Sequence, residues 1–258
     1  MSQEGMKVVM LQTDICWGRQ DENIRQASRL MDEAQGGDLY VLPEMWATGF
    51  VMQPGSMVGS ESDCEALQWM QRVAGERQCA VSGSLAVQAA DGSFRNRHYF
   101  VDGRSGQTSY YDKHHLFTYG GEHQSYVPGQ SHTIVSYMGW RLLLQTCYDL
   151  RFPCWSRYAD GREYDAMICV ANWPSSRQSA WQLLLRARAI ENQCYVIGVN
   201  RVGDDEKCHY IGASAVADVR GRTVAQCKRG LPQALMCDIS KEHLEYSRSR
   251  FRVLEDRD

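Results

Sequence analysis

The chain has 258 residues, of which 43% are hydrophobic, and this is enough for a sizeable core. Its formal net charge of -3, with lysines and arginines dispersed among acids, excludes the basic field that nucleic-acid binding needs. No apolar stretch approaches the ~20 residues that span a bilayer, and the first residues do not resemble a signal peptide. We therefore expect a cytoplasmic protein, built as a single domain over residues 1–258, that binds neither nucleic acid nor membrane.

In the first half of the chain, apolar strand segments alternate with segments whose apolar residues have helical spacing. Ile24, Ala27, Leu30 and Met31 fall on one face of a helix predicted at 21–34. This helix connects two strands that we expect to be parallel neighbours in one sheet. A second helix followed by a third strand extends the pattern to βαβαβ. The predicted strands are 7–11, 38–42 and 80–87, and the second helix is 64–76. A hairpin with strands 97–102 and 108–112 and a glycine-containing turn then adds antiparallel structure.

The second half repeats this mixture of α/β units and hairpins. It contains one long predicted helix, at 179–192, which mixes apolar and basic residues. The predicted strands are 134–135, 140–146, 164–170, 194–199, 213–218, 223–228 and 234–239. Together the two halves indicate an α/β protein in which two mixed β-sheets face each other with helices outside.

Cys147 follows the apolar strand 140–146 and opens a polar turn. Open α/β sheets bind ligands beyond the carboxyl ends of their strands, so this thiol is a candidate nucleophile; the alternative is a small buried hydrophobe. Glu44 lies at a similar strand end, after Pro43, and Lys113 ends a hairpin strand. A thiol needs a base to ionise at neutral pH, which Glu44 could be, and an ammonium group stabilises the oxyanion formed when an amide is attacked.

Metal chemistry has little support in the sequence. The ten cysteines are dispersed and show no Cys-x-x-Cys spacing, and no His-x-x-x-His spacing occurs. We expect most cysteines to be reduced packing residues. A site built from His98, His114, His115 and His123 is the alternative, but adjacent histidines on a strand cannot both face one ion. We therefore expect no metal.

An ordered set of segments resembles the nitrilase superfamily of carbon-nitrogen hydrolases over nearly the whole chain. The segments are LPE at 42–44, YDKHHLF at 111–117, GE at 121–122, YVPG at 126–129, CYDLRFP at 147–153 and ARAIEN at 187–192. The resemblance implies the nitrilase fold, an αββα four-layer sandwich of two mixed β-sheets with outer helices. It also implies catalysis by Glu44, Lys113 and Cys147 without a cofactor.

Further residues around this triad have expected roles. The backbone N–H of Tyr148 is a second oxyanion donor. Glu122 matches a family glutamate that orders Lys113 or the substrate amide, although a surface carboxylate is the alternative. Arg151 is a candidate clamp for a substrate carboxylate, or else an ion-pair partner of Asp149.

Three aromatic residues are candidates for the wall of the substrate pocket: Trp46, Phe117 and Trp173. The alternative for each is ordinary packing in the core.

The resemblance is closest to the omega-amidase branch. It rests on EMWATGF at 44–50, CYDLRFPCWSR at 147–157 and VANWP at 170–174, although Cys154 stands where many relatives carry Glu. It implies an amidase that hydrolyses the terminal amide of small 2-oxo dicarboxylic acid monoamides, such as 2-oxoglutaramate and 2-oxosuccinamate, through a cysteine thioester. It also implies a homodimer or larger homo-oligomer, for which the helix after residue 179 and the segment 244–251 are the candidate interface.

Three other functions fit parts of the same pattern. An N-carbamoyl amino acid hydrolase or a general aliphatic amidase would use the same triad on another substrate. A catalytically silent binding protein with this fold is a different class, and the presence of all three triad residues argues against it.

Overall fold

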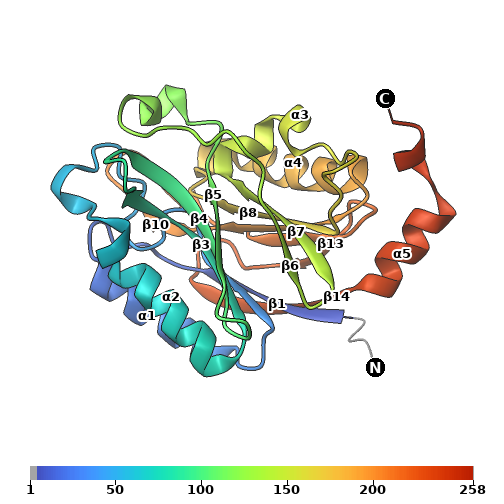
Figure 1. Ribbon diagram of the computed structural model, residues 1–258, viewed down its shortest axis with the longest axis horizontal. Coiled ribbons are helices and arrows are strands. Elements are labelled where there is room, and N and C mark those ends of the chain that lie inside the picture. The colour runs from blue at the N-terminus through green and yellow to red at the C-terminus, as the bar shows by residue number, and fades with distance from the viewer. Residues whose placement is uncertain (1–4, 258) are drawn as a thin grey trace.

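Two six-stranded β-sheets face each other in the computed structural model, which describes residues 5–257 (Figure 1). The first sheet has the order β14-β1-β2-β3-β4-β5 and the second β13-β12-β9-β8-β7-β6. The strands of the first sheet are β1 (Gly5–Gln12), β2 (Leu39–Val41), β3 (Ala80–Gln88), β4 (Phe94–Asp102), β5 (Thr108–Asp112) and β14 (Gln233–Ser240). Those of the second are β6 (Ile134–Tyr137), β7 (Trp140–Thr146), β8 (Ala166–Ala171), β9 (Tyr195–Asn200), β12 (Ala215–Ala217) and β13 (Thr223–Gln226).

Helices cover the outer face of each sheet and complete a four-layer αββα sandwich (Figure 1). Helices α1 (Gln20–Glu33) and α2 (Glu65–Arg77) pack on the first sheet, and α4 (Gln178–Glu191) packs on the second. The short α3 (Pro153–Ser156) follows the turn after β7, and α5 (Lys241–Arg250) follows β14 near the end of the chain. The fold class expected from the sequence is therefore confirmed.

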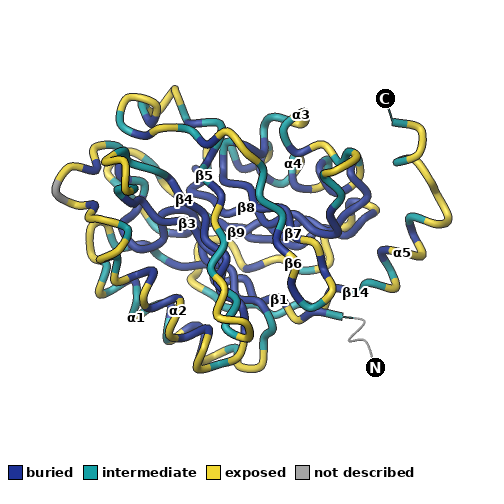
Figure 2. The backbone as a smooth tube through the Cα atoms, in the orientation of Figure 1, coloured by how far each residue is buried: buried dark blue, intermediate teal, exposed yellow. Residues whose placement is uncertain are grey.

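Alternation of side chains along the strands builds the layers. Leu142 and Leu144 of β7 belong to the cluster between the sheets, whereas Leu143 belongs to the cluster under α4. Because successive side chains of a strand point to opposite faces, a continuous apolar strand buries both of its faces. The central strands are accordingly buried throughout, while the helices show an exposed outer face (Figure 2).

The pairings confirm the predicted βαβαβ unit and both hairpins. Strands β1, β2 and β3 are parallel neighbours, and β4–β5 and β12–β13 are antiparallel. One strand crosses between the halves of the chain: β14 pairs with β1 in the first sheet, which the sequence did not indicate. A small hairpin of β10 (Val202–Asp204) and β11 (His209–Ile211) was also not predicted.

Among residues 5–257, no helix is long and apolar enough to cross a membrane.

Candidate active site

Cys147 occupies a strained turn at the carboxyl end of β7. It opens the 3-10 turn Cys147–Arg151 with a backbone φ of 46°, in the left-handed region that non-glycine residues rarely adopt. The N–H of Thr146 donates to Oδ2 of Asp149 at 3.1 Å, which holds the turn closed. The thiol Sγ lies 3.9 Å from the carbonyl oxygen of Asn172, the residue that follows β8. The sharp turn thus presents the thiol at the rim where β7 and β8 end.

Glu44 lies at the same rim, just after β2, and is completely buried. Its Oε1 accepts hydrogen bonds of 2.8 Å from Nζ of Lys113 and from Nδ2 of Asn96. Its Oε2 accepts a hydrogen bond of 2.9 Å from the backbone N–H of Asn172. These donors fix the position of the carboxylate, so it can accept and return a proton without moving far.

Lys113 follows β5 and lies between two carboxylates. Its Nζ donates to Oε1 of Glu44 and to Oε2 of Glu122, both at 2.8 Å, and all three side chains have no exposed surface. Buried charges are stable only when they are paired and hydrogen-bonded in this way. The structure therefore brings together the three residues that the sequence singled out as the triad, because four strand ends meet at one rim.

Burial and neighbouring charges determine the protonation of this cluster. Burial raises the pKa of the Cys147 thiol well above its usual value, and the Glu44 carboxylate raises it further, while Lys113 opposes both. Burial alone would lower the pKa of Lys113, but Glu122 and Glu44 outweigh it and raise that pKa. Burial also raises the pKa of Glu122. At neutral pH the resting group is a thiol beside an ammonium group, so a base must remove the thiol proton before attack.

Glu122 and Asn96 hold the triad in place. Glu122 is buried and accepts from Lys113 Nζ, as expected from the sequence, and also from the N–H of Phe117 at 2.6 Å. Asn96 of β4 donates to both Glu44 and Glu122, at 2.8 and 2.9 Å. Asn96 was not predicted from the sequence. It stands between Arg95 and Arg97, so no apolar pattern marked it as buried.

Asp149 connects the turn that carries Cys147 to the segment that follows Lys113. Its Oδ1 accepts from the backbone N–H and the Nδ1 of His115, at 2.8 and 2.9 Å, and its Oδ2 accepts from Tyr111 Oη at 2.8 Å. The ion pair between Asp149 and Arg151 that the sequence left as an alternative is therefore wrong. The carboxylate of Asp149 faces inward, and the guanidinium of Arg151 instead lies 4.8 Å above the ring of Trp173.

A cavity of about 740 Å³ contains Cys147 in its wall, whereas Glu44 and Lys113 do not line it. Four other residues predicted to support the site also line it, namely Phe117, Tyr148, Arg151 and Trp173.

Trp46 does not line this cavity, so of the two roles considered for it the pocket wall is wrong and core packing holds. It packs 5.2 Å from the ring of Trp69 in the layer between α2 and the first sheet, above Gly83. A side chain at Gly83 would collide with Leu42 and Trp46, so the glycine makes room for the indole. The turn after Glu44 thus directs its carboxylate toward the rim but places Trp46 on the opposite face.

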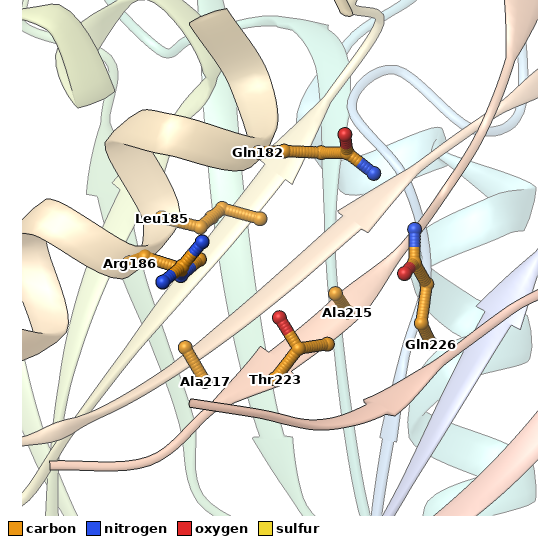
Figure 3. A pocket seen from close by; sticks show the side chains of 7 residues that line it. All are labelled: Gln182, Leu185, Arg186, Ala215, Ala217, Thr223 and Gln226. Carbon is orange, nitrogen blue, oxygen red and sulfur yellow. The ribbon is translucent and has the colours of Figure 1, made fainter. Parts of the chain in front are cut away.

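A second cavity and the buried His98 were also considered as functional sites. A smaller cavity of about 210 Å³ lies between α4 and the strands β12 and β13 (Figure 3). Its described lining contains no cysteine, histidine or carboxylate and consists of Gln182, Leu185, Arg186, Ala215, Ala217, Thr223 and Gln226. His98, one of the histidines considered for metal binding, lies buried between Ser82 Oγ and the carbonyl of Gln145, at 2.8 and 3.1 Å. Across the described part of the chain, no group of three or more His, Cys, Asp or Glu side chains is placed to hold a metal ion.

The sequence profile of the carbon-nitrogen hydrolase family matches residues 7–247. The chain therefore belongs to the carbon-nitrogen hydrolase family, the nitrilase superfamily that its layered fold and buried cysteine site also indicate. Within the family it is similar to proteins of the omega-amidase branch. An omega-amidase YafV from Yersinia enterocolitica is 41% identical over 98% of this chain and 97% of the relative. A 2-oxoglutaramate amidase from Bacillus subtilis is 33% identical over 84% of each chain.

A solved structure extends the comparison to three dimensions. It is that of XC1258 from Xanthomonas campestris, a CN-hydrolase superfamily protein with an arsenic adduct in its active site. The two chains are 35% identical, with 98% of this chain and 97% of that chain covered and a TM-score of 0.93.

Proposed function

We propose that this protein is an amidase that hydrolyses the terminal amide of small 2-oxo dicarboxylic acid monoamides, 2-oxoglutaramate and 2-oxosuccinamate, to the acid and ammonia. One observation carries the proposal: the thiol of Cys147, beside the buried ion pair of Glu44 and Lys113, opens into a cavity that also contains Arg151. The similarity to an omega-amidase and to a 2-oxoglutaramate amidase supports this substrate class.

In the proposed first half-reaction, Glu44 takes the proton from Cys147 as the sulfur attacks the amide carbon. The carbonyl oxygen becomes an oxyanion, to which Lys113 and the backbone N–H of Tyr148 are the proposed donors. As the carbon–nitrogen bond breaks, the protonated Glu44 returns its proton to the departing nitrogen. Ammonia leaves, and a thioester to Cys147 remains.

In the second half-reaction, Glu44 removes a proton from water, and the hydroxide adds to the thioester carbon. The same donors hold the second oxyanion. Its collapse breaks the carbon–sulfur bond and releases the acid, while the proton on Glu44 returns to the sulfur. The overall change is one amide and one water to one acid and one ammonia, and the site returns to its starting state without a cofactor.

The substrate class is tested by an ammonia-release screen over 2-oxoglutaramate, 2-oxosuccinamate, N-carbamoyl amino acids, glutamine and simple aliphatic amides. We expect kcat/KM to be highest for the two 2-oxo acid amides. Release of carbon dioxide together with ammonia would instead identify an N-carbamoyl hydrolase, and a preference for uncharged amides would identify a general aliphatic amidase.

We further propose that the protein acts in the cytoplasm as a homodimer. Large apolar side chains on the outside of α4 and α5 support an interface there: Leu183 is 66% exposed and Tyr246 is 55% exposed. Light scattering of the purified protein should give the mass of two chains, and Leu183→Glu should lower it toward the mass of one. A wild-type protein with the mass of a single chain would contradict the dimer.

A further inference from the structure

A second arginine, Arg177, lines the same cavity as Arg151. It ends the short turn Ser175–Arg177 between β8 and α4, and its guanidinium lies 5.4 Å from the ring centre of Phe117. The carbonyl of Arg177 accepts a hydrogen bond of 2.8 Å from Nε1 of Trp173, the indole over which Arg151 is stacked. Arg151 thus lies over Trp173 and Arg177 over Phe117, and both aromatic rings line the cavity.

Both groups lie close to the nucleophile through short chains of contacts. Trp173 directly follows Asn172, whose carbonyl faces the thiol of Cys147. Phe117, beneath Arg177, contacts the ring of Tyr148, the residue after Cys147, at a centroid distance of 5.2 Å. Trp173 therefore connects Arg151 to Asn172, and Phe117 connects Arg177 to Tyr148. A substrate whose amide carbon meets the thiol would lie in the cavity that both guanidinium groups line.

The charges of these two arginines are available to a ligand. Other enclosed arginines pair with carboxylates, as Arg97 does with Glu61 and Asp112, both at 2.7 Å. In the described part of the chain, neither Arg151 nor Arg177 has a carboxylate within 4.0 Å. A guanidinium that is stacked on an aromatic ring but not paired is ready to bind a carboxylate with two parallel hydrogen bonds.

The acidic groups in the cavity wall do not offset this charge. Among the described lining residues they are Asp205 and Glu206, both between β10 and β11. The carboxylate of Asp205 is already bonded to the backbone N–H groups of Lys207 and Cys208 and to Tyr210 Oη. Glu206 is exposed, and the next residue, Lys207, lines the same cavity. The described wall therefore keeps an excess of positive charge, with Arg151, Arg177 and Lys207 against Asp205 and Glu206.

We propose that Arg177 is a specificity-determining residue that, together with Arg151, binds the 2-oxo acid end of the substrate and rejects amides whose α-carbon carries an ammonium group. A 2-oxo acid presents a carboxylate and an adjacent carbonyl oxygen, which are acceptors for both guanidinium groups. The corresponding α-amino acid amide, glutamine, places a cation against two cations, and repulsion in a partly enclosed cavity disfavours it. This inference rests on the proposed function and extends it to a residue that the sequence analysis did not select.

The test compares three variants, Arg177→Gln, Arg177→Lys and the exposed control Arg157→Gln, on 2-oxoglutaramate, glutamine and the uncharged pentanamide. Loss of a charge-assisted pair predicts that Arg177→Gln raises KM for 2-oxoglutaramate about tenfold or more, with little change in kcat. The kcat/KM for pentanamide should change less than about twofold. The preference for 2-oxoglutaramate over glutamine should fall by about tenfold or more, and Arg177→Lys should restore part of it.

Two failures are distinguishable in this experiment. If Arg177→Gln affects pentanamide as much as 2-oxoglutaramate, or behaves like Arg157→Gln, the role of Arg177 is wrong while the proposed function stands. If the wild-type protein releases no ammonia from 2-oxoglutaramate, the proposed function is wrong, and the inference about Arg177 falls with it.

Discussion

Cys147, the proposed nucleophile, is held in its unreactive thiol form. Burial and the charge of Glu44 both raise the pKa of its thiol. The thiolate is therefore scarce near neutral pH and grows as pH rises through the alkaline range. The rate at which iodoacetamide labels Cys147 should rise with pH up to that raised pKa.

Glu44→Gln should separate the electrostatic effect of Glu44 from its role as a base. Loss of the negative charge leaves Lys113 beside the thiol, so the pKa of Cys147 should fall, and labelling at a fixed pH should become faster, on the order of tenfold. Amide turnover should nevertheless be lost, because no group remains to take and return the proton. Mass mapping of the labelled peptide, with Glu76→Gln as an exposed control, provides the measurement. Slower labelling in Glu44→Gln would contradict this electrostatic account.

At the residue scale, strand ends marked Glu44, Lys113 and Cys147 as candidates, since each follows a recognisable strand, and the family resemblance grouped them as a proposed triad. The residues that position the triad could not be found in the same way. Asn96 contacts Glu44 only because β4 and β5 pair in a particular register, and register depends on the whole sheet. The sequence also could not predict on which face of the first sheet Trp46 packs, because this depends on the space above Gly83.

At the scale of elements, hydrogen bonds between neighbouring segments fix the geometry of the candidate active site. Asp149 joins the turn after β7 to the segment after β5, through the N–H of Thr146 and the side chains of His115 and Tyr111. An amide in its place must point an N–H group at some of these donors, and a buried mismatch of this kind costs about 1–3 kcal/mol.

Asp149→Asn should therefore lower kcat about tenfold or more, with less than about twofold change in KM, because it displaces Cys147 from Lys113 rather than altering the cavity. Steady-state ammonia release at several substrate concentrations separates the two constants. The exposed Asp63→Asn serves as a control for the change in charge. A wild-type kcat in Asp149→Asn would mean that the link between the turns is not needed for catalysis.

His98 links the two sheets: it lies on β4, and its Nδ1 is 3.1 Å from the carbonyl of Gln145 on β7. Burial lowers the pKa of His98 to about 3. In the unfolded chain its pKa is about 6.5, so below that pH the unfolded state binds a proton that the folded state does not. This contribution to stability is complete above pH 6.5 and is lost as pH falls, by about 2 kcal/mol at pH 5.

His98→Gln should consequently flatten the dependence of the unfolding free energy on pH between 7 and 5, even though it lowers stability at pH 7. Urea unfolding at several pH values measures this difference. The exposed His123→Gln is the matched control and should keep the wild-type slope. Parallel pH curves for wild type and His98→Gln would rule out the linkage.

Elements with long apolar runs were predictable, and those that depend on distant partners were not. The strands from β1 to β9 and the helices α1, α2 and α4 were found within a few residues of their observed bounds. The sequence did not indicate that β14 returns to the first sheet, because that pairing joins opposite ends of the chain. The short strands β10 and β11 lack any apolar alternation strong enough to predict them.

At the scale of the whole molecule, we propose that the chain is one domain. A single hydrophobic cluster contains residues of both sheets, from Val8 of β1 to Val216 of β12, and β14 connects the end of the chain to its beginning. Each sheet also packs its outer face against helices, but the two sheets share the cluster between them. Thermal unfolding should therefore be one cooperative transition with equal calorimetric and van't Hoff enthalpies. Two resolved transitions in differential scanning calorimetry would contradict this proposal.

The most direct test of the central claim is to trap the covalent intermediate. Wild-type protein mixed with 2-oxoglutaramate and quenched in acid should yield a peptide in which Cys147, and no other cysteine, carries the mass of one 2-oxoglutaryl group. Cys147→Ala should fold normally, release no ammonia and carry no such group. Full turnover in Cys147→Ala, or an acyl group found on a different residue, would contradict the assignment of Cys147 as the nucleophile of an acidic-amide hydrolase.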